Sequence, residues 1–305
     1  MIGLKSLQRA ALTGIMAVVL LSTASQAQQS YRAPEDAAAA LAAAVKSGPS
    51  DVLKVLGRAA DDIVSSGDEV ADADARQRFT SKYDARHSIK AEGNKKAKLI
   101  LGPDEFTFPI PLVNTKTGWE FDADEGRIEI LYRRIGRNEL DAIQTALAYV
   151  DAQNEYADKD RGEGAGVYAQ RIVSTSGKKD GLFWRDDADP SPLGALAAEA
   201  SAEGYKVGEG GPTPYHGYYF RILKAQGSDA PGGALNYVVK GKMIGGFALI
   251  AWPAEYGNSG VMTFLVNHAG TVYQKDLGIR TDFVARRVAV FDPDQTWKKV
   301  DAAKP

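Results

Sequence analysis

The spacing of apolar residues predicts helices in the first part of the chain. The Ala-rich segment EDAAAALAAAVKSG is expected to form a helix from Pro34 to Gly48, because proline is favoured in the first helical turn and glycine just after the last one. Residues 50–67 and 71–87 also repeat apolar positions at helical spacing. Three helices are therefore predicted before residue 90.

The apolar spacing then changes to two, which is typical of strands. In DEFTFPIPLV the residues on one face are Phe106, Phe108, Ile110 and Leu112, and the two prolines on the other face predict an edge or bulged strand. The segments GWEFD and RIEILY predict two more strands by the same alternation. Helices followed by an antiparallel meander give an α+β layout, whose element order resembles the cone-like fold of the NTF2-like and cystatin-like proteins.

A longer helical pattern follows in RRIGRNELDAIQTALAYVDAQNEYADKD. Asn138 is its expected N-cap, and an apolar stripe is formed by Leu140, Ile143, Leu147 and Val150. Strands are then expected at YYFRIL, LNYVV, GGFALIAW, VMTFLV and TVYQKDL. A long helix packed on an antiparallel sheet resembles the soluble head of pilins and pseudopilins, although the membrane-embedded N-terminal helix of that group has no counterpart in these residues.

The first 27 residues have the pattern of a Sec-type signal peptide. Lys5 and Arg9 precede the apolar core AALTGIMAVVLL, and the small residues around Gln26 fit cleavage after Ala27. We therefore expect a periplasmic or secreted protein.

Composition narrows the classes of function. The chain has 305 residues, a net charge of −2 and no cysteine, so disulfides and a thiol nucleophile are excluded and nucleic-acid binding is not expected. Beyond the signal no apolar run is long enough for a transmembrane segment. Two domains are expected after the signal: an N-terminal α+β domain over residues 30–133, and a C-terminal domain of a long helix and an antiparallel sheet over residues 134–305.

The glycine-rich segment from Gly245 to Gly278 poses the sharpest question about chemistry. Its apolar runs predict three strands joined by a loop and a short turn, with Pro253 ending the first strand. Ser259 stands in that loop as GNSG, one residue short of the nucleophile-elbow motif and followed by a strand rather than a helix. We interpret Ser259 as a residue that shapes a turn.

Several long segments resemble an exported bacterial family known as domain of unknown function 2950. They are FPIPLV, GWEFD, RRIGRNEL, YHGYYFRIL, GGFALIAWPAEYGNSGVMTFLVNHAGTVYQKDLG and VAVFDPDQTW, and they cover nearly all of the chain after the signal. The resemblance implies one inherited unit and assigns no reaction or cofactor.

Two groups of residues are candidates for a binding surface. Arg133, Arg134 and Arg137 gather at the expected start of the long helix, where backbone N–H groups favour anions. Ion pairing of these arginines with acidic residues such as Glu139 and Asp141 is the favoured alternative. The second group consists of aromatic and polar residues that suit either a partly solvent-exposed recognition surface or ordinary packing within a sheet: Tyr215, His216, Tyr218, Tyr219, Trp252, Tyr256, Asn258 and Ser259.

No metal or cofactor is expected. The three histidines lack the spacing of a metal site. The acidic segments DADEG and DKDRG do not match the calcium-binding loop of an EF-hand, and we interpret them as solvated turns.

Three functions remain from this pattern. The favoured one is a non-catalytic exported protein that acts by binding or assembly in the cell envelope, with an envelope protein or a small ligand as partner. The second is a periplasmic small-molecule binder with a pocket lined by Phe106, Phe108, Trp119 and Phe121. The third is a hydrolase, which would need His216 or His268 within hydrogen-bond reach of Ser259 or a carboxylate.

Overall fold

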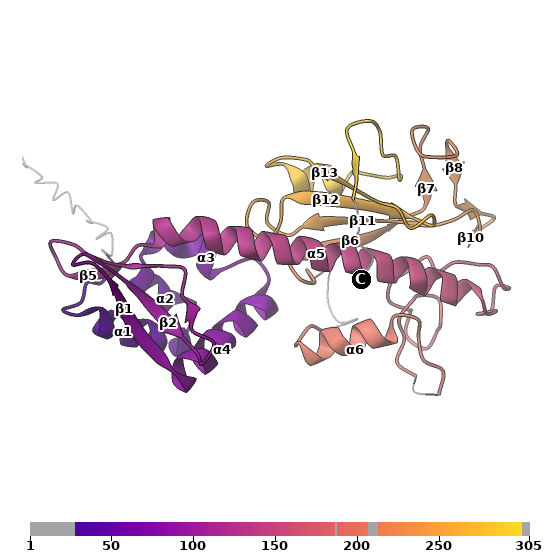
Figure 1. Ribbon diagram of the computed structural model, residues 1–305. Helices are drawn as coiled ribbons and strands as arrows, with labels where there is room; N and C mark the ends of the chain where they lie inside the picture. The colour runs from indigo at the N-terminus through magenta and orange to yellow at the C-terminus, as the bar shows by residue number, and fades with distance from the viewer. Residues whose placement is uncertain (1–27, 187, 207–212, 301–305) are drawn as a thin grey trace, which may run out of the picture.

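The computed structural model describes residues 28–186, 188–206 and 213–300. The expected signal peptide lies outside these residues and stays a prediction. The described part forms two α+β halves that lie one after the other along one long helix, as Figure 1 shows. The mixed α+β class is confirmed.

Four helices and a small antiparallel sheet make up the N-terminal half. The helices are α1 (Pro34–Ser47), α2 (Pro49–Leu56), α3 (Asp61–Val64) and α4 (Glu69–Ala85). The strands are β1 (His87–Glu92), β2 (Lys96–Leu101), β3 (Phe106–Thr107), β4 (Leu112–Asn114) and β5 (Trp119–Phe121), in the order β1-β2-β4-β5 with β3 paired to β2.

Two expected elements in this half are interrupted. The helix predicted over residues 50–67 is broken at Gly57, which adopts a φ of +86°, and continues as a 3₁₀ turn and then α3. The strand predicted in DEFTFPIPLV is divided into β3 and β4, because Pro109 and Pro111 have no N–H to donate to a ladder. Of the aromatic side chains expected to line a pocket, Phe108, Trp119 and Phe121 pack in the core cluster of this half, where Phe108 lies edge-on to Phe121 with ring centroids 6.2 Å apart. Phe106 packs against the smaller cluster that contains Leu99 and Leu101.

The long helix α5 (Ala123–Ala157) has 35 residues and passes through both halves. The prediction of a strand at RIEILY was wrong, and so was Asn138 as N-cap, because the helix begins fifteen residues earlier. The cap is Asp122, whose carboxylate accepts a hydrogen bond from the N–H of Glu125 at 3.0 Å. The boundary expected after Arg133 consequently falls in the middle of α5.

The C-terminal half is a five-stranded antiparallel sheet packed on α5. Its strands are β6 (Tyr218–Leu223), β11 (Ala248–Pro253), β12 (Met262–Asn267), β13 (Val272–Asp276) and β14 (Lys298–Lys299), in the order β14-β13-β12-β11-β6. The smaller elements are α6 (Gly194–Ala202), α7 (Thr281–Ala285) and the two-stranded pairs β7 (Ala225–Gln226) with β8 (Leu235–Asn236) and β9 (Val238–Val239) with β10 (Lys242–Met243).

The core of this half lies between α5 and the sheet. Ile143 and Val150 of the expected apolar stripe are buried against β11 and β12, but Leu140 is exposed. As predicted, β11 ends at Pro253 and a tight turn at Gly270 joins β12 to β13. The segment LNYVV, predicted as one strand, is split between β8 and β9. Within the described ranges, no helix is long and apolar enough to cross a membrane.

Candidate functional site

The two halves meet at a polar junction beside the middle of α5. Four segments contribute to it: the connection between α3 and α4, the middle of α5, the loop between β11 and β12, and the segment between α6 and β6. Most of the predicted site residues lie in or next to these four segments.

Arg134 joins the halves through its guanidinium. Its Nη1 donates to the carbonyl of Asp62 at 2.8 Å, and its Nη2 donates to the carbonyl of Ile63 at 2.7 Å. Nη1 also donates to Oδ1 of Asn258 in the β11–β12 loop. Burial lowers the pKa of Arg134, and the acids Asp72 and Asp62 oppose that change. Arg134 therefore connects the two halves through hydrogen bonds of its partly buried guanidinium.

The neighbouring arginines have different environments. Arg133 is exposed and pairs with Glu129 on the same helix, and it lies 5.7 Å above the ring of Phe106. Arg137 is exposed as well. The three arginines were expected at the start of a helix, but they lie at its middle, where the backbone N–H groups are already bonded within the helix. The predicted anion site at a helix N-terminus is therefore wrong.

The expected pairing of the arginines with Glu139 is also not what the structure shows. Oε1 of Glu139 accepts hydrogen bonds from the backbone N–H groups of Val261 and Met262, each at 3.0 Å. The adjacent residue Asn138 donates to the carbonyl of Ser259 at 2.9 Å. These bonds attach α5 to the start of β12.

Ser259 and Asn258 are interior residues of the β11–β12 loop. The Ser259 hydroxyl has no exposed surface; it accepts from the N–H of Glu255 at 2.9 Å and lies 3.2 Å from the carbonyl of the same residue. Nδ2 of Asn258 donates to the carbonyl of Ser65 at 2.9 Å. The interpretation of Ser259 as a turn-shaping residue is confirmed. Within the described ranges, no hydrogen bond connects it to a histidine.

Asp68 is the buried carboxylate that the sequence did not single out. Its Oδ1 caps α4 by accepting from the N–H groups of Val70 and Ala71, each at 3.1 Å. Its Oδ2 accepts from the Tyr205 hydroxyl at 2.8 Å and from the N–H of Gly217 at 2.9 Å. One side chain therefore caps a helix of the N-terminal half and positions two residues of the C-terminal half.

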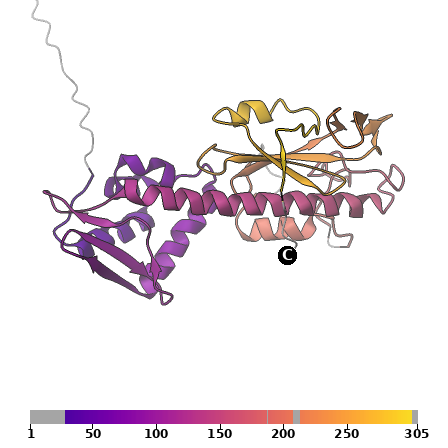
Figure 2. The same cartoon turned by 45° about the horizontal axis from the view of Figure 1, so that its top comes forward.

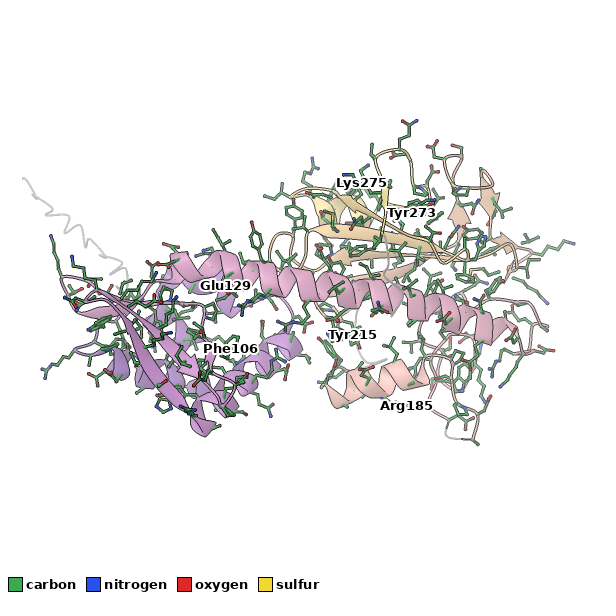
Figure 3. The ribbon with its side chains drawn as sticks, viewed as in Figure 1. Phe106, Glu129, Arg185, Tyr215, Tyr273 and Lys275 are labelled. Atoms are coloured by element: carbon green, nitrogen blue, oxygen red, sulfur yellow. The ribbon has the colours of Figure 1, made fainter. Side chains whose placement is uncertain are left out.

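Next to this buried network lies a half-exposed surface, which we call the junction face. Its members are two tyrosines, a histidine and two acids: Tyr205, Tyr215, His216, Asp141 and Glu203. In Figure 3 one member of this surface, Tyr215, is labelled and lies between α5 and α6.

Aromatic rings form the centre of the junction face. Tyr215 lies 5.0 Å from Tyr205 and 4.1 Å from His216, measured between ring centroids. Nε2 of His216 is 3.3 Å from a carboxylate oxygen of Glu203, and Nδ1 is 3.8 Å from one of Asp141. His216 has a φ of +47°, a conformation that non-glycine residues rarely adopt. The imidazole therefore lies between acids of α5 and of the segment after α6.

The acids around the junction face act on the pKa values of its two tyrosines. Burial raises the pKa of Tyr215, and the charges of Glu203, Glu199 and Asp141 raise it further. The pKa of Tyr205 is also raised, first by burial and then by Asp68. Both tyrosines therefore keep their hydroxyl protons, and the face presents neutral rings bordered by carboxylates.

The other predicted residues are divided between the two faces of the large sheet, since successive strand residues point to opposite faces. Tyr218 is in the core below α5, with its hydroxyl donating to the carbonyl of Met262 at 2.9 Å. Tyr219 and Trp252 lie on the other face, with ring centroids 5.6 Å apart. Tyr256 is a separate surface residue that donates to Asp276 at 3.1 Å.

The two remaining histidines pack against tyrosine rings. His87 stacks on Tyr83 with ring centroids 3.8 Å apart, and His268 packs edge-on against Tyr237. Over the residues that the structure describes, no group of three His, Cys, Asp or Glu side chains is arranged to hold a metal ion.

The chain belongs to DUF2950, a family of proteins of unknown function, whose model matches residues 28–300. This finding confirms the family resemblance seen in the sequence. No curated protein and no solved structure matches the chain, and nothing supports the resemblance to pilin heads.

Proposed function

We propose that this DUF2950 protein is an exported, non-catalytic protein of the cell envelope that acts by binding, and that its junction face receives a cationic group of the partner. The observation that carries the proposal is the packing of Tyr205, Tyr215 and His216 between Asp141 and Glu203. The signal-like N-terminal residues support export.

Aromatic rings bordered by carboxylates suit a positive charge for two physical reasons. The face of a tyrosine ring attracts a cation through its quadrupole, which contributes about 0.5–2 kcal/mol. Carboxylates beside the rings add Coulomb attraction and hydrogen-bond acceptors. Because Asp68 holds Tyr205 and the backbone of Gly217, the rings are fixed before a partner arrives. A lysine-rich segment or a polyamine has the chemistry that this face would select.

Binding of tetralysine tests the proposal. The exported protein is titrated calorimetrically at low salt, with tetraglutamate as the probe of opposite charge. We expect tetralysine alone to bind, and Tyr215→Leu or Asp141→Asn to weaken it about tenfold. Matched controls are Tyr132→Leu and Asp151→Asn, which change the same residue types at exposed positions of α5.

Equal binding of the two peptides, or an equal loss in the control variants, would overturn the assignment of the junction face. The non-catalytic part is tested separately on simple ester, peptide and glycan substrates. Turnover that depends on His216 would refute that part even if tetralysine binds.

Self-assembly is a second candidate, because α5 exposes three large apolar side chains. Ile128, Tyr132 and Leu140 are 60%, 73% and 63% exposed. Exposed apolar rows of this kind occur at protein–protein interfaces. Light scattering during gel filtration should then show an oligomer that the double variant Ile128→Ser/Tyr132→Ser converts to a monomer. A monomeric wild-type protein at high concentration would reject assembly through α5.

A further inference from the structure

The segment around α7 exposes apolar side chains to an unusual degree. Ile279 is 89% exposed, Phe283 46% and Val284 37%. Together with Arg280 and Arg287 they form a surface that we call the α7 tip. In Figure 2, α7 is the golden helix at the top, and α6 lies below α5.

The α7 tip is held firmly from below. Thr281 and Ala285 have no exposed surface, and the Thr281 hydroxyl donates to the carbonyl of Gly278 at 2.6 Å. Nη2 of Arg221 donates to the carbonyls of Ala285 at 2.9 Å and Val288 at 2.7 Å, which satisfies the end of the helix. The exposed apolar side chains are therefore presented outward by a fixed support.

The indole of Trp252 adds a further anchor. Its Nε1 donates to Oδ1 of Asp282 at 3.0 Å, and Arg286 binds the same carboxylate at 2.8 Å. The only acid of residues 279–287 is thus occupied by internal partners.

Positive charge surrounds the apolar side chains. Residues 279–287 contain three arginines and one aspartate, a net charge of +2 in a chain whose net charge is −2. The guanidinium carbons of Arg280 and Arg287 lie 4.7 and 3.3 Å from the centre of the Phe283 ring. In the part of the chain that the structure describes, neither of these two arginines forms an ion pair. Their charges are available to an anionic partner.

We propose that the α7 tip docks on an anionic lipid surface, with Ile279, Phe283 and Val284 entering the headgroup region and Arg280 and Arg287 contacting lipid phosphates. Charge complementarity requires an anionic partner, and the apolar side chains require that the same partner also accept hydrocarbon. A bilayer with anionic lipids offers both over a continuous surface. A folded acidic protein would need a matching pocket for the projecting Ile279.

This inference does not depend on the junction face. The α7 tip lies on the side of the large sheet that carries Trp252, whereas α5 packs on the other side. Either surface can therefore be removed without touching the other.

Sedimentation with vesicles tests the inference. The full chain is expressed, and the exported protein is mixed with phosphatidylcholine vesicles, with and without one third phosphatidylglycerol. We expect binding only to the anionic vesicles and a decrease with added salt. Replacing both arginines with glutamine should lower the partition coefficient about 25-fold, or about fivefold per arginine. Ile279→Ser/Phe283→Ser should lower it at least tenfold.

Matched control variants alter the same chemistry elsewhere. Leu235→Ser/Ile244→Ser removes two other exposed apolar side chains, and Lys90→Gln/Lys178→Gln removes two other exposed charges. Far-UV circular dichroism verifies that each variant is folded. The controls should bind anionic vesicles as the wild type does.

Other results would overturn the inference. One is the absence of vesicle binding, and another is an equal loss in the controls. Binding to polyglutamate but not to vesicles would identify an acidic protein as the occupant. A dimer that Ile279→Ser dissociates, again without vesicle binding, would identify a second copy of the chain.

Discussion

Replacing Arg134 with methionine is expected to lower the free energy of unfolding by about 3 kcal/mol. Methionine keeps much of the aliphatic stem but removes three hydrogen bonds, two to carbonyls at the end of α3 and one to Asn258. A hydrogen bond from a charged group contributes about 1.5–3 kcal/mol, so the sum could reach about 9 kcal/mol. Water can reach part of this junction and replace some of the lost bonds, so we expect about a third of that sum.

The control for this prediction is the adjacent residue. Arg133 has the same side chain on the same helix, but it is exposed, where it pairs with Glu129 one turn away and lies over the ring of Phe106. Arg133→Met should therefore cost no more than about 1 kcal/mol. Urea unfolding followed by far-UV circular dichroism gives both values. Equal effects of the two substitutions would show that Arg134 does not connect the halves and would refute the reasoning.

Three further predictions concern single positions. Thr263→Val should raise the free energy of unfolding by about 1 kcal/mol in urea titrations, because the Thr263 hydroxyl is fully buried and has no hydrogen-bond partner among the residues that the structure describes. A lower stability would mean that the hydroxyl has a partner after all. Gly126→Ala should lower the free energy of unfolding by about 2 kcal/mol, and with it the melting temperature, since its Cβ would lie 2.7 Å from Cγ1 of Ile110. Gly136→Ala, whose Cβ would meet open space, should raise the free energy of unfolding by about 1 kcal/mol. If both glycines respond alike, the close approach at Gly126 is not real. The free energy of unfolding should also fall above about pH 10, because tyrosines of the unfolded chain ionise there while burial keeps the pKa of Tyr218 in the folded protein above its usual value. Tyr218→Phe should make this fall less steep in urea titrations at a series of pH values.

The elements that sequence alone predicts correctly are those with local signals. In β11 to β13 the apolar runs, Pro253 and the glycine turn at Gly270 all indicate the same strand boundaries. Each of these strands pairs with the next strand along the sequence. Each of these features acts within a few residues. The three strands follow from the sequence for that reason.

Missed elements show where local signals are ambiguous. RIEILY alternates like a strand, but Asp122 and the acids after it favour a helix start, and the helix prevails because it packs on both halves. The hairpin of β1 and β2 was not predicted, because β1 is mostly exposed on both faces and so shows no apolar alternation.

The junction was only partly visible in the sequence for a different reason. Arg134, Asn258 and His216 were recognised as polar residues in suggestive segments, but their partners are distant along the chain. The bond from Tyr205 to Asp68 joins residues 137 positions apart. No periodicity or motif reports such a pair, so Asp68 and Tyr205 could be found only from coordinates.

The contacts also connect Arg134 to the junction face while bypassing the α7 tip. Arg134 holds the end of α3, the following turn leads to Asp68, and Asp68 holds Tyr205 and the backbone next to His216. No step of this path passes through α7. Arg134→Met should therefore weaken tetralysine binding several-fold at a temperature where the variant stays folded, and leave the partition to anionic vesicles unchanged. Calorimetry and vesicle sedimentation on one preparation measure both quantities. A parallel loss of the two activities would mean that the substitution disturbs the whole fold, and unchanged peptide binding would mean that the junction face is ordered without Arg134.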